Sequence, residues 1–222
     1  MTPHYRIVTG TRGWPGPLTF GVLALWFVVV LTAALAGGFR VGPEDAPLPL
    51  LLGVAIPVAL FAAAYAASDR FRAYILGLDL GLLTALQGWR VLGAGFLFLY
   101  AWDILPGLFA YPAGLGDMAI GVAAPFLAAA LYTVGVSRRR LVLWNWLGLL
   151  DFVVAVTLGI LTSGGAFGWL TGAVSNAPMQ QLPLLLIPAF AVPVFILVHF
   201  AALLQLRQAR AVAGQGVPAP VA

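Results

Sequence analysis

The sequence predicts an all-α protein, a polytopic membrane bundle of six transmembrane helices with one additional helix at the membrane interface. Of its 222 residues, 62% are hydrophobic and only 8% are charged, whereas about 25% of the residues of a soluble domain are charged. Too few polar side chains exist to cover a water-exposed surface, so most of the surface must face lipid. Apolar runs of about 20 residues, the length of a membrane-spanning helix, recur along the chain.

Six apolar runs predict the spans, and together they form one membrane domain over residues 1–206. No small-residue cleavage site follows the first run, so we expect a retained helix and not a signal peptide. Residues 207–222 are rich in Gly, Pro and Ala and predict a flexible cytoplasmic tail. The expected spans are Leu18–Gly37, Pro47–Ala67, Leu86–Leu105, Pro112–Gly135, Leu141–Thr162 and Leu182–Leu206.

The segment before the third span is apolar but also carries charges at Asp69, Arg70, Arg72 and Asp79. A continuous helix over 71–105 would be roughly 50 Å long, which exceeds the roughly 30 Å hydrocarbon core. We therefore expect an interfacial helix along the cytoplasmic face, with the chain turning into the membrane near Gln87. A long, steeply tilted helix is the alternative.

Arginines gather in alternate connections between the spans. Cytoplasmic loops retain positive charge, so this pattern predicts that both termini are cytoplasmic. The opposite loops hold Arg40 beside Glu44 and Asp45, and Asp103 without a neighbouring base. The arginine excess fits contacts with lipid headgroups, and nucleic acid is not an expected partner. The arginines on the predicted inner side are Arg6, Arg12, Arg70, Arg72, Arg138, Arg139, Arg140, Arg207 and Arg210.

The sixth span carries Pro183, Pro188 and Pro193 at five-residue intervals. Each proline removes an amide donor and frees a carbonyl one turn earlier, so we expect this span to be bent or locally unwound. Broken helices often border transporter binding sites. An ordinary proline-kinked packing helix is the alternative.

Three ionisable residues in different spans are predicted to lie at similar depth. Asp151 follows Arg140 by eleven residues, about 16 Å of helix, and His199 precedes Arg207 by eight, about 12 Å. Arg90 falls about 10 Å above the inner boundary by the same measure. A charge at the bilayer centre costs about 2.5–3.5 kcal/mol on insertion scales, so we expect Arg90 to pair with Asp151.

Gln87 and Asn145 complete this expected polar cluster. Gln87 shares a helical face with Arg90, and Asn145 lies on the same span as Asp151 but nearer the inner boundary. Two interpretations remain open. A buried ion pair can simply fix the register of two helices, or the cluster can line a polar cavity or ion path, since ionisable residues within membranes are usually functional.

A second, outer-surface cluster is predicted from Asp103, which closes the third span, and Asp117, which opens the fourth. Asp117 precedes Arg138 by twenty-one residues, or about 31 Å of helix, which places it near the outer surface. Asp117 can offset the positive end of its helix, or the two aspartates can form an entrance for a cation or substrate.

Two short motifs resemble those of presenilin-like intramembrane aspartyl proteases. Residues 114–117 read GLGD, like one motif of that family, and residues 100–103 read YAWD, with the tyrosine and aspartate of the other. The resemblance implies paired catalytic aspartates at Asp103 and Asp117. The family's proline-alanine-leucine motif is absent, and the expected depth of both aspartates is too shallow for cleavage inside the membrane.

The residue types exclude several kinds of chemistry. There is no cysteine and every one of the 11 basic residues is arginine, which excludes thiolate metal sites, a lysine Schiff base and a P-loop. The aspartates and His199 lack the spacing of a zinc site, so no metal is expected. No cofactor is expected either, although a haem held by His199 and Met118 or Met179 stays open.

We therefore expect an integral membrane protein that binds or transports a small solute or ion. Arg90 would recognise an anionic group, Asp151 would act as counter-ion or proton carrier, and His199 would be a titrating partner. One alternative is a non-catalytic accessory subunit that packs in a larger membrane complex, as a homo-oligomer or against a partner membrane subunit. The other is a membrane enzyme acting on a lipid-soluble substrate, and an enzyme is the less favoured expectation.

Overall fold

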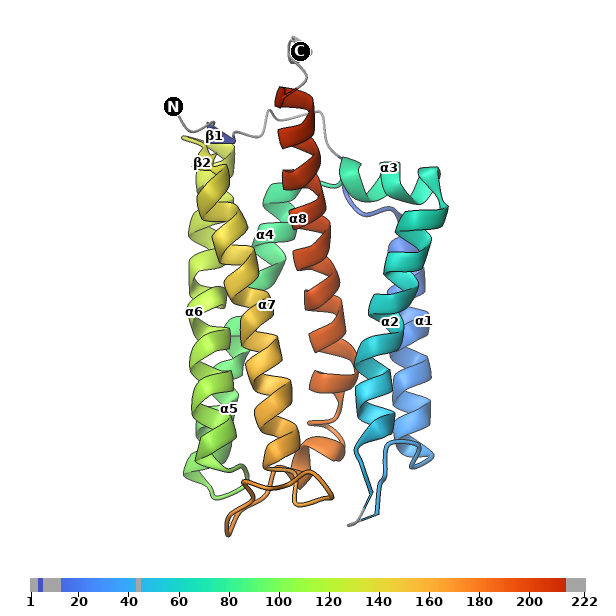
Figure 1. Ribbon diagram of the computed structural model, residues 1–222, viewed down its shortest axis with the longest axis vertical. Coiled ribbons are helices and arrows are strands. Elements are labelled where there is room, and N and C mark those ends of the chain that lie inside the picture. Colours follow the sequence, from blue (N-terminus) through green and yellow to red (C-terminus); the bar gives the residue numbers. More distant parts are fainter. Residues whose placement is uncertain (1–3, 6–12, 43–44, 215–222) are drawn as a thin grey trace.

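The computed structural model describes residues 4–5, 13–42 and 45–214, and it is an all-α bundle (Figure 1). Six of its helical segments are long and apolar enough to cross a membrane, which confirms the predicted six-span bundle. Their bounds are α1 (Pro17–Leu35), α2 (Leu48–Ala67), a third span of α4 (Leu80–Leu86), the 3-10 helix η1 (Gln87–Gly93) and α5 (Ala94–Ala101), then α6 (Gly107–Tyr132), α7 (Arg138–Leu161) and a sixth span of the π-helix η3 (Ile187–Ala191) and α8 (Val192–Gly214).

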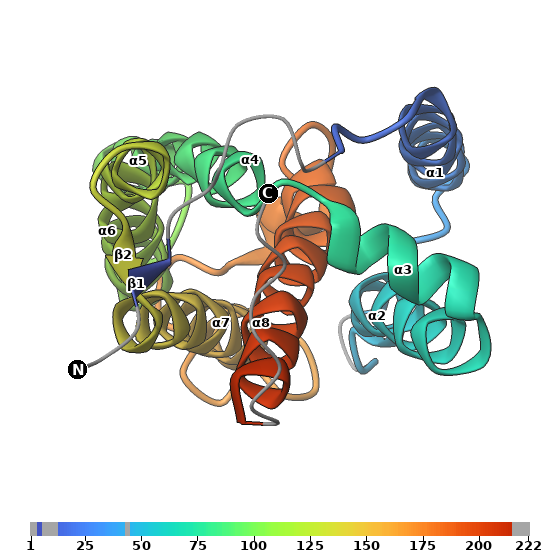
Figure 2. The ribbon, with the colours of Figure 1, turned by 90° about the horizontal axis from the view of Figure 1, so that it is seen from above.

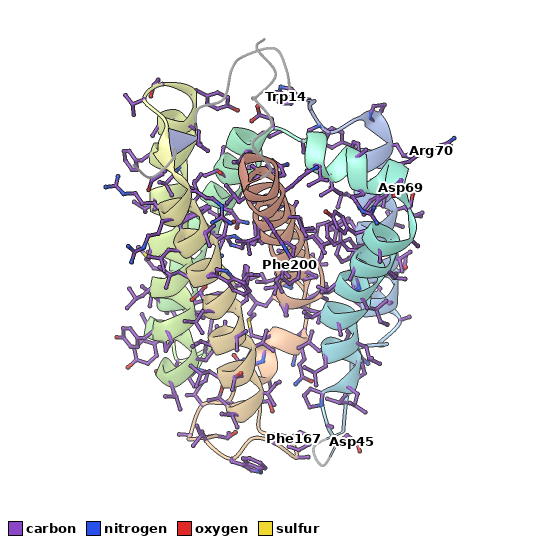
Figure 3. All side chains as sticks on the ribbon, turned by 45° about the horizontal axis from the view of Figure 1, so that its top comes forward. Trp14, Asp45, Asp69, Arg70, Phe167 and Phe200 are labelled. Atoms are coloured by element: carbon purple, nitrogen blue, oxygen red, sulfur yellow. The ribbon has the colours of Figure 1, made fainter. Side chains whose placement is uncertain are left out.

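The two ends of the bundle differ in what they hold. One, here called the terminal end, carries the start of α1, the turn between α6 and α7, and the end of α8 (Figure 1). The other, here called the loop end, carries the connecting residues 36–42 and 45–47, 102–106 and 162–186, the last of which contain the 3-10 helix η2 (Ala177–Gln180). Asp45 and Phe167 mark the loop end, and Asp69 and Arg70 lie towards the terminal end (Figure 3).

A short helix, α3 (Asp69–Gly77), lies crosswise at the terminal end, between α2 and α4 (Figures 1 and 2). The Ser68 hydroxyl caps it by accepting from the Phe71 amide at 3.2 Å. The chain then turns at Asp79, not near Gln87 as predicted. The reason is a second cap, because Asp79 Oδ1 accepts from the Leu82 amide at 2.7 Å and starts α4 there.

Hydrogen bonds join the N-terminal segment to the terminal end of the bundle. Strand β1 (His4–Tyr5) pairs antiparallel with β2 (Val136–Ser137) in the turn between α6 and α7. Further along, the Gly13 amide donates to the Gly77 carbonyl at 3.0 Å, and the Gly13 carbonyl accepts from the Asp79 amide at 3.2 Å. These bonds fix the entry into α1 relative to the turn between α3 and α4.

The third span packs closely against α6 because glycines line their contact. A methyl group on Gly121 would overlap the backbone nitrogen of Val91, and one on Gly114 would lie 3.0 Å from the Gly93 carbonyl. Small residues let membrane helices approach in this way. This close contact brings η1, which carries Arg90, directly against α6.

Helix boundaries differ from the expected ones in ways that matter for the site. Helix α6 begins at Gly107 and continues through Pro112, which the sequence suggested as its start. Helix α7 begins at Arg138, one turn earlier than expected. Helix α8 runs to Gly214, beyond the domain end predicted at residue 206; the remainder of the predicted tail, residues 215–222, lies outside the described part of the chain.

The sixth span is locally unwound, as predicted, at Pro188, whereas Pro193 lies within the regular helix α8. Pro183 lies in the turn that precedes the span, and Pro188 lies in the π-helical turn η3. The ring of Phe190, in the same turn, meets Trp26 and Phe27 of α1 edge-to-face, each with 5.2 Å between ring centroids. This turn therefore provides the aromatic contact that holds α1 against the bundle.

A buried cluster beside an apolar pocket as the candidate functional site

Arg90 lies at the centre of the bundle with 2% of its surface exposed. Its Nε donates to Asp117 Oδ1 at 2.7 Å, and Nη2 donates to Asp151 Oδ2. Its Nη1 donates to the Gly148 carbonyl at 3.3 Å and lies 3.0 Å from His199 Nε2. Four acceptors from α6, α7 and α8 therefore surround one guanidinium carried by η1.

An aromatic ring covers one face of this guanidinium. Arg90 Cζ lies 4.0 Å from the centroid of the Phe152 ring, a cation–π contact of the kind that strengthens when water is excluded. Phe152 is one residue after Asp151 on α7, so the helix that supplies the carboxylate also supplies the ring. Arginine suits this position because its planar group can stack and donate several hydrogen bonds at once.

His199 and Asn145 extend the cluster by a chain of hydrogen bonds. An arginine has only donors, so His199 Nε2 must accept from Arg90, and its Nδ1 carries the proton. That proton is donated to Asn145 Oδ1 at 2.8 Å, while Asn145 Nδ2 donates to the Leu141 carbonyl at 2.8 Å. The chain is consistent at every link only with a neutral imidazole, and His199 has no exposed surface.

Two glycines on neighbouring helices make room for these side chains. A methyl group on Gly148 would overlap the imidazole of His199, and one on Gly116 would overlap the carboxylate of Asp151. Even alanine is therefore too large at either position. Gly148 of the fifth span thus provides the space for the polar group of another span.

Gln87 lies one turn before Arg90 but does not join the ion cluster. Its Nε2 donates to the Phe195 carbonyl at 3.1 Å, and its buried Oε1 has no partner among the residues described. Gln87 therefore ties the third span to the sixth. The predicted cluster of five thus divides into four residues in contact and one neighbour.

Asp117 belongs to the buried cluster and not to an outer-surface pair, which corrects the sequence prediction. Helix α6 starts at Gly107, ten residues earlier, so Asp117 lies about 15 Å along the helix from that end. Asp103, by contrast, is exposed in the connection after α5 and has a positive φ of 53°. The two aspartates lie in different surroundings, so the arrangement does not provide the paired aspartates that the protease resemblance implied.

The charges of the cluster do not cancel when both carboxylates are ionised. Two carboxylates face one guanidinium and a neutral imidazole, which leaves one net negative charge. Asp117 and Asp151 have side chains that are 16% and 11% exposed, whereas the Arg90 side chain is 1% exposed. Each carboxylate uses one oxygen on Arg90, and its second oxygen has no protein donor within the described ranges. The accessible part of the cluster is therefore its negative part.

Asp117 also lines a partly open cavity of about 70 Å³ between α2, α7 and the sixth span. A cavity of this volume holds roughly five water molecules. Its α7 wall consists of residues spaced three and four apart, which face the same side of the helix. They span eight residues, or about 12 Å, and are Phe152, Ala155, Val156, Gly159 and Ile160, with Ser163 of the lining just beyond the end of the helix.

The pocket is a narrow apolar slot with polar groups near its two ends. At the inner end the lining includes Asp117 and Phe152, and at the loop end it includes Asn176 and Phe109, whose ring would lie 3.6 Å from a methyl group on Gly159. Asn176 is 5% exposed, and its Nδ2 donates to the Gly159 carbonyl at 3.3 Å. Its buried Oδ1 has no donor in the described part of the chain, so an acceptor is available there.

The cluster offers little to a metal or haem. Within the described ranges no group of three or more His, Asp or Glu side chains is placed to hold a metal ion. Both ring nitrogens of His199 are already engaged, with Arg90 and with Asn145. An axial bond to haem iron needs one of them free, so the haem alternative does not fit this arrangement.

Comparison with known proteins gives a family but no activity. A family model described as a domain of unknown function, DUF8737, matches residues 47–207. The match covers more than half of the chain, so the chain belongs to this family, and the matched region contains every residue of the cluster and the pocket. No curated protein and no solved structure matches the chain.

Proposed function

We propose that this member of the DUF8737 family binds a small positively charged solute within the membrane and carries it in the manner of a transporter. One observation supports this most directly: two carboxylates share a single arginine at the inner end of a pocket, and only the carboxylates reach accessible space. A cation at Asp117 would neutralise the remaining negative charge, which is costly to keep in a medium of low dielectric constant.

The same geometry gives less support to recognition of an anion by Arg90. Four of its five N–H donors already have acceptors, and its side chain is almost wholly enclosed. An anion would have to displace a carboxylate and would add to the negative charge of the site. In our proposal Arg90 instead holds Asp117 and Asp151 together, and His199 with Asn145 holds Arg90.

We also propose that the terminal end faces the cytoplasm and that the pocket is reached from outside. Arginines lie near the terminal end, where α3 carries Arg70 and Arg72 and α7 starts with three consecutive arginines at 138–140. Positive charge of this kind is retained on the cytoplasmic side. The pocket extends towards the opposite end of the bundle.

The accessory-subunit alternative loses one of its supports. A subunit interface within the membrane would use faces of small residues, but Gly93, Gly114 and Gly121 are used in contacts within the chain. The large apolar side chains that stay exposed, such as Leu25, Leu60 and Phe126, suit lipid acyl chains. For an enzyme, the nucleophilic side chains that line the pocket are the Asp117 carboxylate and the Ser163 hydroxyl, and within the described ranges no hydrogen bond joins Ser163 to a histidine or carboxylate that could activate it.

The proposal can be tested with purified protein in lipid nanodiscs by its melting temperature. A panel of small ammonium ions, carboxylates and neutral amides would be added in turn, because a ligand that binds the folded state raises its stability. We expect only ammonium ions to stabilise the protein, Asp117→Asn to abolish the response, and Asp103→Asn, the exposed control, to retain it. Stabilisation by carboxylates and not by ammonium ions would overturn the proposal.

A further inference from the structure

We infer that the ligand, on the premise of the proposed function, is an elongated organic ammonium ion with an apolar body and a hydrogen-bond donor at its far end. Three parts of the pocket support this: the carboxylate at the inner end, the apolar slot along α7, and the unpartnered acceptor near the loop end.

The inner end suits an organic ammonium group better than a metal ion. Asp117 supplies negative charge at this end, while Phe96 and Phe109, in edge-to-face contact with 5.3 Å between ring centroids, line the slot nearer the loop end. An ammonium group donates charge-assisted hydrogen bonds to a carboxylate and needs no further oxygen ligands from the walls. A metal ion such as Ca²⁺ needs about six to eight oxygen ligands to replace its water, which apolar walls cannot offer.

The middle of the slot suits a hydrocarbon chain. On one side the α7 wall presents Ala155 and Val156, on another α2 presents Leu51 and Val54, and the sixth span closes it with Val192. A volume of about 70 Å³ spread along this wall leaves little room for a broad, branched ligand. A slender apolar body would fill the slot and remove its surface from water.

The far end requires a donor from the ligand. The Gly159 carbonyl can only accept, so the Asn176 amide must point its Nδ2 towards Gly159, and its Oδ1 is left as the free acceptor. A buried acceptor without a partner is unfavourable, and a hydroxyl or second amine on the ligand would satisfy it. Both polar ends of the slot therefore offer acceptors, and the ligand must supply a hydrogen-bond donor at each end.

The spacing of the two ends sets the length of the ligand. Arg90 stacks on Phe152 and binds Asp117, so Asp117 lies near the level of Phe152, whereas Asn176 contacts Gly159. Seven residues of helix separate Phe152 from Gly159, or about 10 Å. An extended chain of roughly six to eight carbon atoms between the two donor groups spans this distance.

Three probes of related structure test this inference: octylamine, the amino alcohol of the same length (aminooctanol) and octanol. Their affinities would be measured by calorimetry on the protein in nanodiscs, with Asp117→Asn in identical nanodiscs to report partition into lipid. We expect aminooctanol to bind about two- to tenfold more tightly than octylamine, the range of one added hydrogen bond. Octanol should bind no better than it does to Asp117→Asn.

A second variant tests whether the hydroxyl group of aminooctanol binds at Asn176. In Asn176→Ala the advantage of aminooctanol over octylamine should vanish while octylamine still binds in the Asp117-dependent way. The probe comparison on the unaltered protein keeps the test valid if this variant does not fold. Equal affinity of the short butylamine, octylamine and aminooctanol, all dependent on Asp117, would overturn this inference but leave the proposed function standing. No Asp117-dependent binding of any amine would overturn both.

Discussion

Arg90 and Asp117 lie 27 positions apart in the sequence, yet Arg90 Nε is 2.7 Å from Asp117 Oδ1. The contact forms because the third span and α6 are antiparallel neighbours whose glycines let the backbones approach closely. It places a second carboxylate on an arginine that already holds Asp151. A simple ion pair that fixes helix register would need only one of them, and the second leaves one net negative charge when both are ionised.

Replacing Arg90 is expected to destabilise the protein severely. Arg90→Ala would leave two buried carboxylates without a partner, and loss of one member of a buried pair typically lowers the free energy of unfolding by about 3–5 kcal/mol. Arg90→Lys keeps the charge but cannot reach four acceptors and stack on Phe152. We therefore expect its stability to lie between those of the unaltered protein and Arg90→Ala. Melting temperatures in nanodiscs check both, with the exposed Arg70→Lys as control (Figure 3). An unaltered melting temperature in Arg90→Ala would contradict the central role of the arginine.

The glycines beside the cluster give a prediction with a matched control. Gly116→Ala would push a methyl group into the Asp151 carboxylate, and overpacking of this kind costs about 1–3 kcal/mol. In Gly95→Ala, on α5, the added methyl group would have no other atom within 4 Å. This variant should be as stable as the unaltered protein or slightly more stable, because alanine favours helix. Thermal unfolding of the two variants distinguishes them. If Gly116→Ala is as stable as Gly95→Ala, Asp151 does not lie where the structure places it.

The protonation of His199 can be observed directly. The hydrogen-bond chain from Arg90 through His199 to Asn145 requires a neutral ring with its proton on Nδ1. Nitrogen NMR of histidine-labelled protein should show this tautomer, and a His4→Gln variant removes the only other histidine signal. A doubly protonated ring at neutral pH would show that Arg90 does not donate to His199.

Acid should weaken binding of a cation at this site. The groups that face it are Arg90 from η1, Asp117 from α6, Asp151 from α7 and His199 from α8. Of these, protonation of either carboxylate removes the net negative charge, so a proton and a cation compete. Octylamine affinity should fall as the pH is lowered from about 9 to about 5, a range in which the amine itself keeps its charge. An affinity that rises on acidification would contradict competition.

Sequence reasoning predicted the six spans and the meeting of Arg90, Asp151 and His199 because hydropathy, helical rise and charge in lipid are local or nearly local properties. It misplaced Asp117 because depth was measured from Arg138 and the start of α6 was assigned to Pro112, although the helix begins at Gly107. A usable signal existed: Asp117 shares its face with Gly121, Ala124 and Ala128, which indicated a neighbouring helix.

Other parts of the site could not be predicted from the sequence. Asn176 lies in the long connection after α7, where no periodicity reports what a side chain faces. The 3-10 turn that carries Arg90 also has no signature of its own, since QGWRVLG suits an α-helix equally well. Both depend on contacts between segments far apart in the sequence.

The π-helical turn of the sixth span presents two surfaces at once. Ile187 and Pro188 form part of the pocket wall, while the ring of Phe190 contacts the rings of Trp26 and Phe27 in α1. Rewinding this turn to a regular helix would rotate both surfaces together. The width of the slot and the position of α1 against the bundle are therefore coupled. A ligand that widens the slot must also displace α1.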